Sequence, residues 1–476
     1  ERWPSASFGL DKSQLHALQT ALTNEVALIQ GPPGTGKTYI GLKVMRLLLA
    51  NQEPRIFDPK NPILVVCYTN HALDQFLEGI LKFNRSGIIR VGGRCKSKKL
   101  EQYTLKNRRE KNSMFQRVKD DIEDAKRSLI KPSKMLHASN QCIVSLVQLE
   151  RVILPRLFQQ FSFNALTRKL DELRNEVDLS TLDRADVIGM TTTGAARCRN
   201  ILNKLPIKVV VVEEAAEVLE AHIITSMPKS TEHLILIGDH QQLKPSPNVH
   251  ELATKMNLEI SLFERLVRNN LPYAKLTCQH RMKPRIADLL RPHIYETLTD
   301  NKNVKEYEDI RGVDKSVFFI SHQHKEDMIV NGKTKRNQHE AEFIVALCKY
   351  LLLQEYKPSQ ITILTTYTGQ LLALKNIINK RAVELEDVYV TVVDNYQGEE
   401  NDIILLSLVR SNESGSIGFL EVHNRVCVAL SRAKKGLFCI GNMKLLQKES
   451  NVWYTIVKSL EEDQLIGNGL ALKCGN

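Results

Sequence analysis

The sequence predicts an α/β protein in which two successive series of parallel strands are flanked by helices. Short apolar runs at 26–29, 63–68 and 209–212 have the composition of strands that are buried on both faces. Apolar residues recur at helical spacing over 39–49 and again over 339–353. Because ligands of an open parallel sheet bind beyond the carboxyl ends of its strands, we expect functional residues in the segments that follow these runs.

The composition is that of a globular protein with a basic balance. Of 476 residues, 42% are hydrophobic and 25% are charged, and the length suggests about two to four domains. Lysine and arginine total 66 against 54 acidic residues, which gives a formal net charge of +12. This surplus favours a polyanionic partner such as nucleic acid, although it can also serve solubility alone.

The nine cysteines are odd in number, widely spaced and free of any C-x-x-C pair. We expect buried free thiols at Cys67, Cys427 and Cys439, a reducing compartment, and no zinc site within the chain. The first residues resemble neither a signal nor a transit peptide, and no apolar run has the length of a membrane span. We therefore expect a cytoplasmic protein, with the nucleus as the alternative. We also expect that both ends of the sequence lie within a longer protein.

Residues 31–38 (GPPGTGKT) match the phosphate-binding pattern G-x-x-x-x-G-K-[ST]. The match lies between the predicted strand 26–29 and the predicted helix 39–49. Backbone N–H groups of such a turn, together with the helix N-terminus, hold phosphate. Lys37 would reach the outer phosphates, and the Thr38 hydroxyl would bind Mg²⁺. The flanking pattern favours a nucleotide site over a chance match.

Two glutamates follow the apolar run 209–212. In a nucleoside triphosphatase, one acidic group holds the metal through water and another orients and deprotonates the attacking water. Glu213 and Glu214 suit these two roles. A surface glutamate pair is the alternative, but the four valines place these carboxylates at the end of a buried strand.

Short polar residues mark further candidate contacts. Gln14 precedes the loop, and its amide could read an adenine edge, although such a residue is often only exposed. Thr69 and Asn70 follow the strand at 63–68 and could contact nucleic-acid phosphate or simply cap the next helix. Gln242 follows a strand at 234–237 and could sense the γ-phosphate.

The character of the chain changes between 94 and 182, where strand patterns vanish. Residues 94–134 contain 14 basic and 6 acidic side chains. We expect an inserted helical module with a basic face, and a solvated helical hairpin without a ligand is the alternative.

A second αβ series follows. Residues 276–282 are expected to open it, and it contains no second phosphate loop, so it appears as a sheet that completes the site made by the first. The predicted strands lie at 317–320, 361–364, 388–393, 403–409 and 437–440. The predicted domains are 1–93 with 183–272, the insertion 94–182, and 273–476.

The order of motifs resembles that of superfamily 1 helicases of the Up-frameshift type, in particular the branch that carries NFX-type zinc fingers. The resemblance covers only a helicase core. It implies two RecA-like domains with ATP between them and single-stranded nucleic acid bound across both. The motifs that carry it are Gln14, 31–38, 69–75, 191–194, 213–216, 238–243, 279–282, 365–370, 394–402 and 425–433.

The residue patterns and the resemblance together assign roles to individual positions. The resemblance makes Arg281 and Arg432 arginine fingers, and it places Glu400 against the ribose. The catalytic residues are Lys37, Glu214, Gln242, Arg281 and Arg432; the nucleotide is bound by Gln14, Gly31, Pro33, Gly34, Thr35, Gly36, Lys37, Thr38, His280 and Glu400; Mg²⁺ is bound by Thr38 and Glu213; and RNA is contacted by Thr69, Asn70, Thr192, Thr365 and Arg425.

Three positions depart from the family pattern. Glu213 replaces the usual aspartate, and its extra methylene displaces the carboxylate near Mg²⁺. His280 replaces a base-stacking tyrosine, and Cys427 replaces an asparagine. We expect altered ATPase activity in an ATP- and Mg²⁺-dependent helicase or translocase that moves 5′ to 3′ on single-stranded RNA. The alternatives are an ATP-gated RNA clamp and a DNA helicase.

Overall fold

The computed structural model describes residues 9–51, 61–130, 154–247, 249–291, 293–329 and 334–473. The chain divides into two compact units. The first unit comprises Glu1–Gly41, Glu214–Glu220 and Leu236–Asn476, and the second comprises Leu42–Glu213 and Ala221–Ile235. In the part of the chain that is described, no helix is long and apolar enough to cross a membrane.

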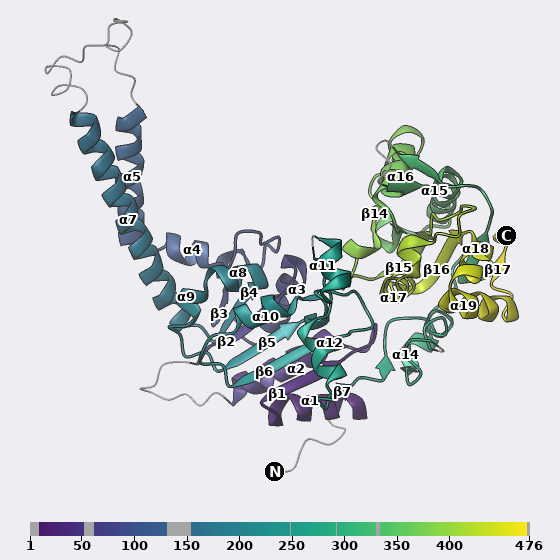
Figure 1. Cartoon of the computed structure of the whole chain (residues 1–476), viewed down its shortest axis with the longest axis horizontal. Coiled ribbons are helices and arrows are strands. Elements are labelled where there is room, and N and C mark those ends of the chain that lie inside the picture. Colours follow the sequence, from purple (N-terminus) through teal and green to yellow (C-terminus); the bar gives the residue numbers. More distant parts are fainter. Residues whose placement is uncertain are drawn as a thin grey trace, which may run out of the picture. The chain divides into compact units, whose positions relative to one another are not determined.

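A seven-stranded sheet has the order β3-β4-β2-β5-β6-β1-β7 (Figure 1). β2 pairs in parallel with both β4 and β5, and all five residues of β2 are buried, as its run of apolar residues predicts. The strands are β1 (Val26–Gln30), β2 (Ile63–Cys67), β3 (Ile88–Arg90), β4 (Val187–Thr191), β5 (Val209–Glu213), β6 (His233–Gly238) and β7 (Ala274–Lys275).

The helices of this first series begin at residues that the sequence marks as caps. Asp11 accepts from the backbone N–H of Gln14 and completes a capping box at α1, and Thr69 accepts from Ala72 at α3. The helices are α1 (Lys12–Thr23), α2 (Lys37–Ala50), α3 (Asn70–Leu81), α8 (Thr192–Arg197), α9 (Arg199–Leu202), α10 (Glu220–Ser226), α11 (His250–Lys255) and α12 (Leu262–Arg268).

The described part of the predicted insertion is mainly α-helical from Leu105 onward, whereas residues 94–104 contain turns, a short 3-10 segment and a bridge from Thr104 to Arg90. α4 (Leu105–Glu110) precedes α5 (Ser113–Ile130), which lies alongside α7 (Leu154–Asp183) in Figure 1. Arg109 donates two hydrogen bonds to the Asp178 carboxylate, at 2.7 and 2.6 Å, and so ties α4 to α7. A bidentate pair of this kind fixes both position and orientation. The middle of the predicted insertion, at 131–153, lies outside the described residues.

A second sheet has six strands in the order β14-β13-β15-β16-β10-β17. Its strands pair in parallel, as β13 does with β15 and β15 with β16. The strands are β10 (Val317–Ser321), β13 (Ile361–Thr365), β14 (Tyr389–Val392), β15 (Asn401–Ser407), β16 (Ala433–Gly441) and β17 (Ile466–Gly467). The α/β class with two parallel sheets flanked by helices is thereby confirmed.

The two faces of this sheet carry two separate cores. Successive residues of β15 alternate between them: Ile404 and Leu406 pack with one core, and Ile403 and Leu405 with the other. Helices α17 and α19 cover the first face, and α15 and α16 cover the second. The helices are α13 (Pro284–Ala287), α14 (Lys302–Lys305), α15 (Gln338–Leu353), α16 (Thr368–Arg381), α17 (His423–Leu430), α18 (Met443–Glu449) and α19 (Asn451–Glu462).

The segment between the two series differs from its prediction. Residues 276–282 do not open the six-stranded sheet. Instead β7 joins the edge of the first sheet beside β1, and β8 (Cys278–Gln279) pairs only with β9 (Thr299–Asp300) in a small ladder. A further two-stranded ladder joins β11 (Asp327–Ile329) to β12 (Thr334–Arg336). The local residue pattern could not show that Ala274–Lys275 would pair with β1 while Cys278–Gln279 would pair with β9.

Candidate nucleotide and nucleic-acid site

The loop 31–36 connects β1 to α2 and has the geometry of a phosphate cradle. Gly34 and Gly36 adopt φ angles of +74° and +85°, which glycine accepts without strain. A Cβ atom at Gly31 would lie 2.2 Å from Cγ of Lys37, so the side chain of Lys37 requires glycine there. The loop therefore fits a phosphate group at the N-terminus of α2. Two further predicted residues, Pro33 and Thr35, are buried in the loop.

Lys37 and Glu214 lie together beside this loop. Lys37 Nζ donates to the carbonyl oxygen of Gly31 at 3.0 Å and lies 3.9 Å from Glu214 Oε1. The two side chains are only 10% and 15% exposed. Glu214 has φ +54° and ψ +42°, a left-handed conformation that is uncommon for a residue with a side chain. Strain of this kind is concentrated at functional sites, which agrees with a role for the Glu214 carboxylate.

Two further carboxylates, those of Glu213 and Glu217, lie close to Glu214 in the chain. Glu213 ends β5 and is 3% exposed, whereas Thr38 at the start of α2 is exposed; they belong to different units. Glu217 was not predicted. Burial, followed by repulsion from Glu214 and Asp394, raises its pKa from 4.5 to about 8. Its spacing of three residues after Glu214 is the only signal that the sequence gives.

Gln242 is held by a buried network around Asp239. Gln242 Nε2 donates to Asp239 Oδ2 at 2.9 Å, and Gln30 Nε2 donates to Asp239 Oδ1 at 3.1 Å. The Tyr295 hydroxyl also donates to Asp239 Oδ2, at 2.5 Å, and lies 3.3 Å from Cys427 Sγ. This arrangement directs the amide oxygen of Gln242 away from Asp239. Asp239 and Tyr295 are positioning residues that sequence reasoning missed, although Asp239 is in a motif.

Arg432 brings a buried guanidinium to Gln242. Its Nη2 donates to Gln242 Oε1 at 3.4 Å, and its other nitrogens donate to the carbonyl oxygens of Val428 and Glu399 at 3.0 and 3.3 Å. Burial, and then repulsion from Arg281, lower the pKa of Arg432 to about 10. The group therefore stays cationic at neutral pH, fixed in place by backbone oxygens.

Arg281 lies against the phosphate loop. A Cβ atom at Gly34 would be 2.5 Å from Cβ of Arg281, so the loop and this residue are in close contact. Arg281 forms an ion pair with Glu400, and Lys434 pairs with the same carboxylate at 3.0 Å. Burial alone would raise the pKa of Glu400, but Arg281 and Lys434 hold it below its ordinary value. In the structure, Glu400 thus neutralises the predicted finger Arg281.

Gln14 and His280 border the same loop. Gln14 is 4% exposed; its Nε2 donates to the carbonyl oxygen of Thr35 at 3.4 Å, and its Oε1 accepts from the backbone N–H of Asp11. The backbone N–H of His280 donates to the carbonyl oxygen of Gly34 at 2.8 Å. Both residues are therefore hydrogen-bonded to the phosphate loop.

Three predicted RNA contacts belong to the second unit. Thr69 is exposed but uses its hydroxyl to accept from the backbone N–H of Ala72, so it caps α3. Asn70 Oδ1 accepts from the buried Arg90 at 2.7 Å, which leaves the amide of Asn70 to other partners. Thr192 starts α8 and is 2% exposed. All three follow the carboxyl ends of β2 and β4, as predicted.

The other two predicted RNA contacts belong to the first unit. Thr365 ends β13 and is fully buried, and its hydroxyl has no hydrogen-bond partner among the described residues. Arg425 lies in α17, where its Nη2 is 3.3 Å from Asp394 Oδ2 and its guanidinium is 4.6 Å from the centroid of the Phe419 ring. The structure therefore shows Arg425 in a protein-internal pairing and Thr365 in the sheet.

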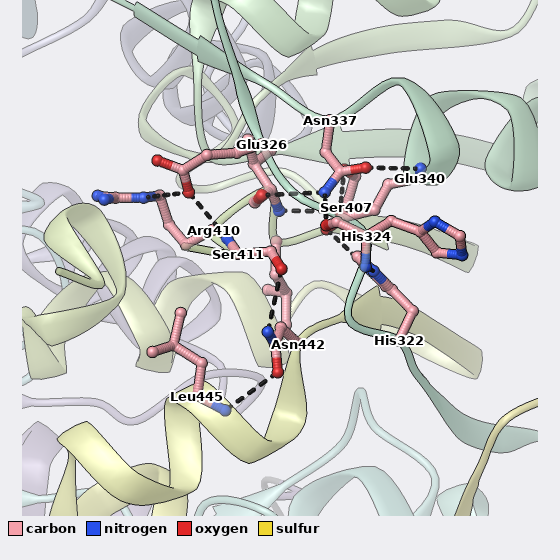
Figure 2. A network of polar contacts seen from close by, with 12 residues as sticks. His322, His324, Glu326, Asn337, Glu340, Ser407, Arg410, Ser411, Asn442 and Leu445 are labelled. Carbon is pink, nitrogen blue, oxygen red and sulfur yellow. Dashed lines mark hydrogen bonds and ion pairs between the residues drawn. The ribbon is translucent and has the colours of Figure 1, made fainter. Parts of the chain in front are cut away.

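A closed polar network joins the carboxyl ends of the second sheet and was not predicted (Figure 2). Its centre is Glu340, which is fully buried at the start of α15. Its carboxylate accepts from the Ser407 hydroxyl at 2.6 Å and the Val409 backbone at 2.8 Å, and lies 2.9 Å from His322 Nε2. Val409 has φ +72°, so a strained residue follows β15 as Glu214 follows β5.

The same network continues to β16 through Glu326 (Figure 2). Glu326 Oε2 accepts from Arg410 Nε at 2.9 Å and from the backbone N–H of Ser411 at 2.8 Å. The Ser411 hydroxyl accepts from Asn442 Nδ2 at 3.0 Å, and Asn442 caps α18. Every one of these groups is satisfied by a neighbour, so the network fixes the loops at this edge of the sheet.

The chain matches two families, each described as an AAA domain, over residues 9–246 and 258–444. It is 37% identical to human NFX1-type zinc finger-containing protein 1 over all of its length and 35% of that protein. It is 31% identical to the fission yeast helicase required for RNAi-mediated heterochromatin assembly 1, covering 96% of this chain and 60% of that protein. The fission yeast ATP-dependent helicase upf1 is 29% identical, covering 97% and 47%.

The chain thus spans about a third of the length of the NFX1-type relative. The matched families cover both the phosphate-loop half and the half that carries Arg281 and Arg432. The three relatives match this chain over 96–100% of its length. The chain therefore belongs to the Upf1-like superfamily 1 helicases, of which it comprises the helicase core.

Proposed function

We propose that this chain is an ATP- and Mg²⁺-dependent helicase or translocase that moves 5′ to 3′ on single-stranded RNA in the cytoplasm. The observation that carries the proposal is the contact between Arg432 and Gln242. It lies within the unit that also holds the phosphate loop, Lys37 and Glu214, whereas Glu213 belongs to the other unit.

Each group of the chain has a defined task in this proposal. Lys37 and the loop N–H groups bind the phosphates, and Glu214 accepts a proton from the attacking water. Thr38 and Glu213 would hold Mg²⁺, since both offer the oxygen ligands that this ion prefers. When bound, Mg²⁺ would neutralise charge on the phosphates.

The two arginines stabilise the charge that develops in the transition state. Arg432 is already desolvated and fixed by carbonyl oxygens, so it needs little reorganisation. Arg281 must exchange its ion pair with Glu400 for the phosphate. Exchange of this ion pair in each cycle would couple hydrolysis to movement of the segment that carries Arg281.

RNA is favoured over DNA by the relatives. The names of two of them refer to RNAi and to nonsense transcripts, and they match this chain over 96% and 97% of its length. The net charge of +12 suits either polyanion. The described basic side chains between Arg94 and Arg127 offer further positive charge for a strand backbone.

The proposal is tested by ATP hydrolysis with and without single strands of matched RNA and DNA sequence. We expect stimulation by RNA, weaker stimulation by DNA, and loss of hydrolysis in Lys37→Ala and Glu214→Gln. Failure of every strand to stimulate the wild type would contradict the proposal. Preference for DNA would make the chain a DNA helicase.

A second function, an ATP-gated RNA clamp, is favoured by Glu213. Its side chain is longer than that of aspartate and displaces the carboxylate that helps to organise Mg²⁺. This displacement would slow ATP hydrolysis and leave ATP-dependent binding of RNA intact. A strand-displacement assay with a duplex that carries a 5′ overhang separates the two functions. Unwinding that depends on ATP would exclude a pure clamp, whereas ATP-dependent binding without displacement would support it.

A further inference from the structure

Three side chains that are distant in the sequence meet at the edge of the phosphate loop. They are Asp11, which caps α1; Cys278, in β8; and His280, which follows β8. A carboxylate oxygen, the sulfur and a ring nitrogen lie within 4.8 Å of one another. A thiol, an imidazole and a carboxylate are the three ligand types that proteins use for zinc.

The backbone holds these three residues in place. The backbone N–H of Thr277 donates to the Ser13 hydroxyl at 3.1 Å, which binds the Cys278 segment to the start of α1. The backbone N–H of His280 donates to Gly34 at 2.8 Å. Asp11 Oδ1 accepts from both the backbone of Gln14, at 2.9 Å, and the Ser13 hydroxyl, at 2.6 Å. The cluster is thus built on the capped helix and the loop.

Two of the three cluster residues keep a polar atom that this scaffold does not pair. Asp11 Oδ2 and His280 Nε2 are buried and have no hydrogen-bond partner among the described residues. Cys278 Sγ accepts a long contact of 3.8 Å from Asn301 Nδ2. Buried polar atoms are normally satisfied, and unpaired ones point to a missing partner. Here two such atoms lie beside a thiol.

The geometry suits a tetrahedral ion better than Mg²⁺. With ligand bonds of about 2.0–2.3 Å, the ligand atoms of a zinc site lie roughly 3.3–3.8 Å apart. The three atoms would need to close by at most about 1.5 Å, within reach of side-chain rotation. Mg²⁺ prefers oxygen ligands and would not select a thiolate. A thiolate and a carboxylate also balance the charge of Zn²⁺.

We propose that Asp11, Cys278 and His280 form a zinc site at the edge of the nucleotide pocket, with the fourth position open to solvent, and that zinc and nucleotide oppose each other's binding. Zn²⁺ bonds to the sulfur as the thiol proton leaves to solvent. The opposition rests on the proposed function, since a ring held by zinc cannot turn toward the base of a bound nucleotide. The zinc site itself does not depend on that function.

The first experiment measures zinc binding without nucleotide. Equilibrium dialysis with Zn²⁺ should give one equivalent per chain, and Co²⁺ should give a thiolate-to-cobalt charge-transfer absorption. Cys278→Ser should abolish this absorption and weaken zinc binding by at least about tenfold. Cys198→Ser, which removes another partly buried thiol in the second unit, should change neither.

A second variant separates loss of the ligand from loss of the fold. Asp11→Asn keeps an acceptor for the α1 cap but removes a carboxylate, so the thermal midpoint should be retained while zinc affinity falls. If the wild type binds no zinc, or if Cys278→Ser binds it as tightly, the site is wrong. If Asp11→Asn binds zinc unchanged, Asp11 is not a ligand and the three-residue site is overturned.

The second experiment measures the opposition. A fluorescent ATP analogue is titrated with and without Zn²⁺ in the wild type and in Cys278→Ser. Because ATP itself chelates Zn²⁺, the comparison between the two proteins is decisive: only the wild type should show a zinc-dependent loss of affinity. Equal losses would overturn the opposition. Absence of nucleotide binding altogether would contradict the proposed function, while the dialysis result would still decide the zinc site.

Discussion

The carboxyl ends of the two sheets are built on opposite principles. After β1 and β5, Lys37 and Glu214 are 3.9 Å apart and lie beside a loop of glycines. After β10 and β15, the Glu340 carboxylate is fully buried, and both of its oxygens are hydrogen-bonded to neighbouring groups. One edge holds charges that a ligand can recruit, whereas the other uses its charges to lock its own loops.

Both edges nevertheless contain one strained residue that is not glycine. Glu214 has φ +54° and Val409 has φ +72°. At the first edge the strained residue places its carboxylate 3.9 Å from Nζ of Lys37. At the second edge the hydrogen bond from the Val409 backbone to Glu340 stabilises the strained turn. A strained backbone conformation therefore positions a carboxylate at the first edge, and at the second edge it belongs to a turn that is hydrogen-bonded to Glu340.

The largest expected effect concerns Arg432, whose guanidinium contacts Gln242. Arg432→Ala should lower the rate of ATP hydrolysis about 10³-fold, because it removes the guanidinium that stabilises transition-state charge. Single-turnover phosphate release measures the effect, and Arg432→Lys should recover only part of it because lysine lacks the planar fork. Unchanged hydrolysis in Arg432→Ala would show that the buried guanidinium is structural.

The next effect concerns Glu340, at the carboxyl ends of the strands of the second sheet. Glu340→Ala should lower the free energy of unfolding by about 3–5 kcal/mol, since it leaves buried donors of Ser407 and Val409 without an acceptor. Denaturant unfolding gives the value. Glu342→Ala, four residues into the same helix and exposed, is the matched control and should change it by less than about 0.5 kcal/mol. Equal effects would mean that the network does not stabilise this edge.

A pH experiment tests whether burial and neighbouring carboxylates raise the pKa of Glu217 at the first edge. The pKa of Glu217 is about 8 in the folded chain and 4.5 ordinarily, so the folded state binds more protons between these values. Its contribution to stability is present below pH 4.5 and declines as pH rises toward 8. Glu217→Gln, which imitates the neutral acid, should leave stability at pH 5 nearly unchanged.

At pH 8 the same variant should be more stable than the wild type by about 1–3 kcal/mol. Denaturant unfolding at both pH values provides the measurement, with Glu220→Gln as the control at a salt-bridged position. A parallel pH dependence in wild type and Glu217→Gln would show that Glu217 is already ionised in the fold.

The smallest expected effect concerns Tyr295, whose hydroxyl donates to Asp239. Tyr295→Phe removes one donor to Asp239 and should lower stability by about 1 kcal/mol. Since Asp239 directs Gln242, the rate of hydrolysis should fall about three- to tenfold while the Kd for nucleotide stays constant. A change in Kd alone would place Tyr295 outside the positioning network.

Much of this organisation could be read from local sequence patterns. The glycines of the phosphate loop, the cap at Thr69 and the acids after β5 act over a few residues, so spacing reveals them. The buried thiols Cys67, Cys427 and Cys439 were also correctly expected, since each lies in an apolar element. The roles that the family resemblance gives to site residues stay predictions.

By itself, then, the sequence determined the α/β class, the order of the strands along the chain and the position of the phosphate loop. Only the tertiary structure decided which distant groups meet: Asp239 with Tyr295, Glu340 with Ser407, and Asp11 with Cys278 and His280. The absence of C-x-x-C argued against zinc, but ligand spacing is informative only when the ligands share one local element. Long-range burial removes water from such groups, and their pairing then depends on how strands and helices pack.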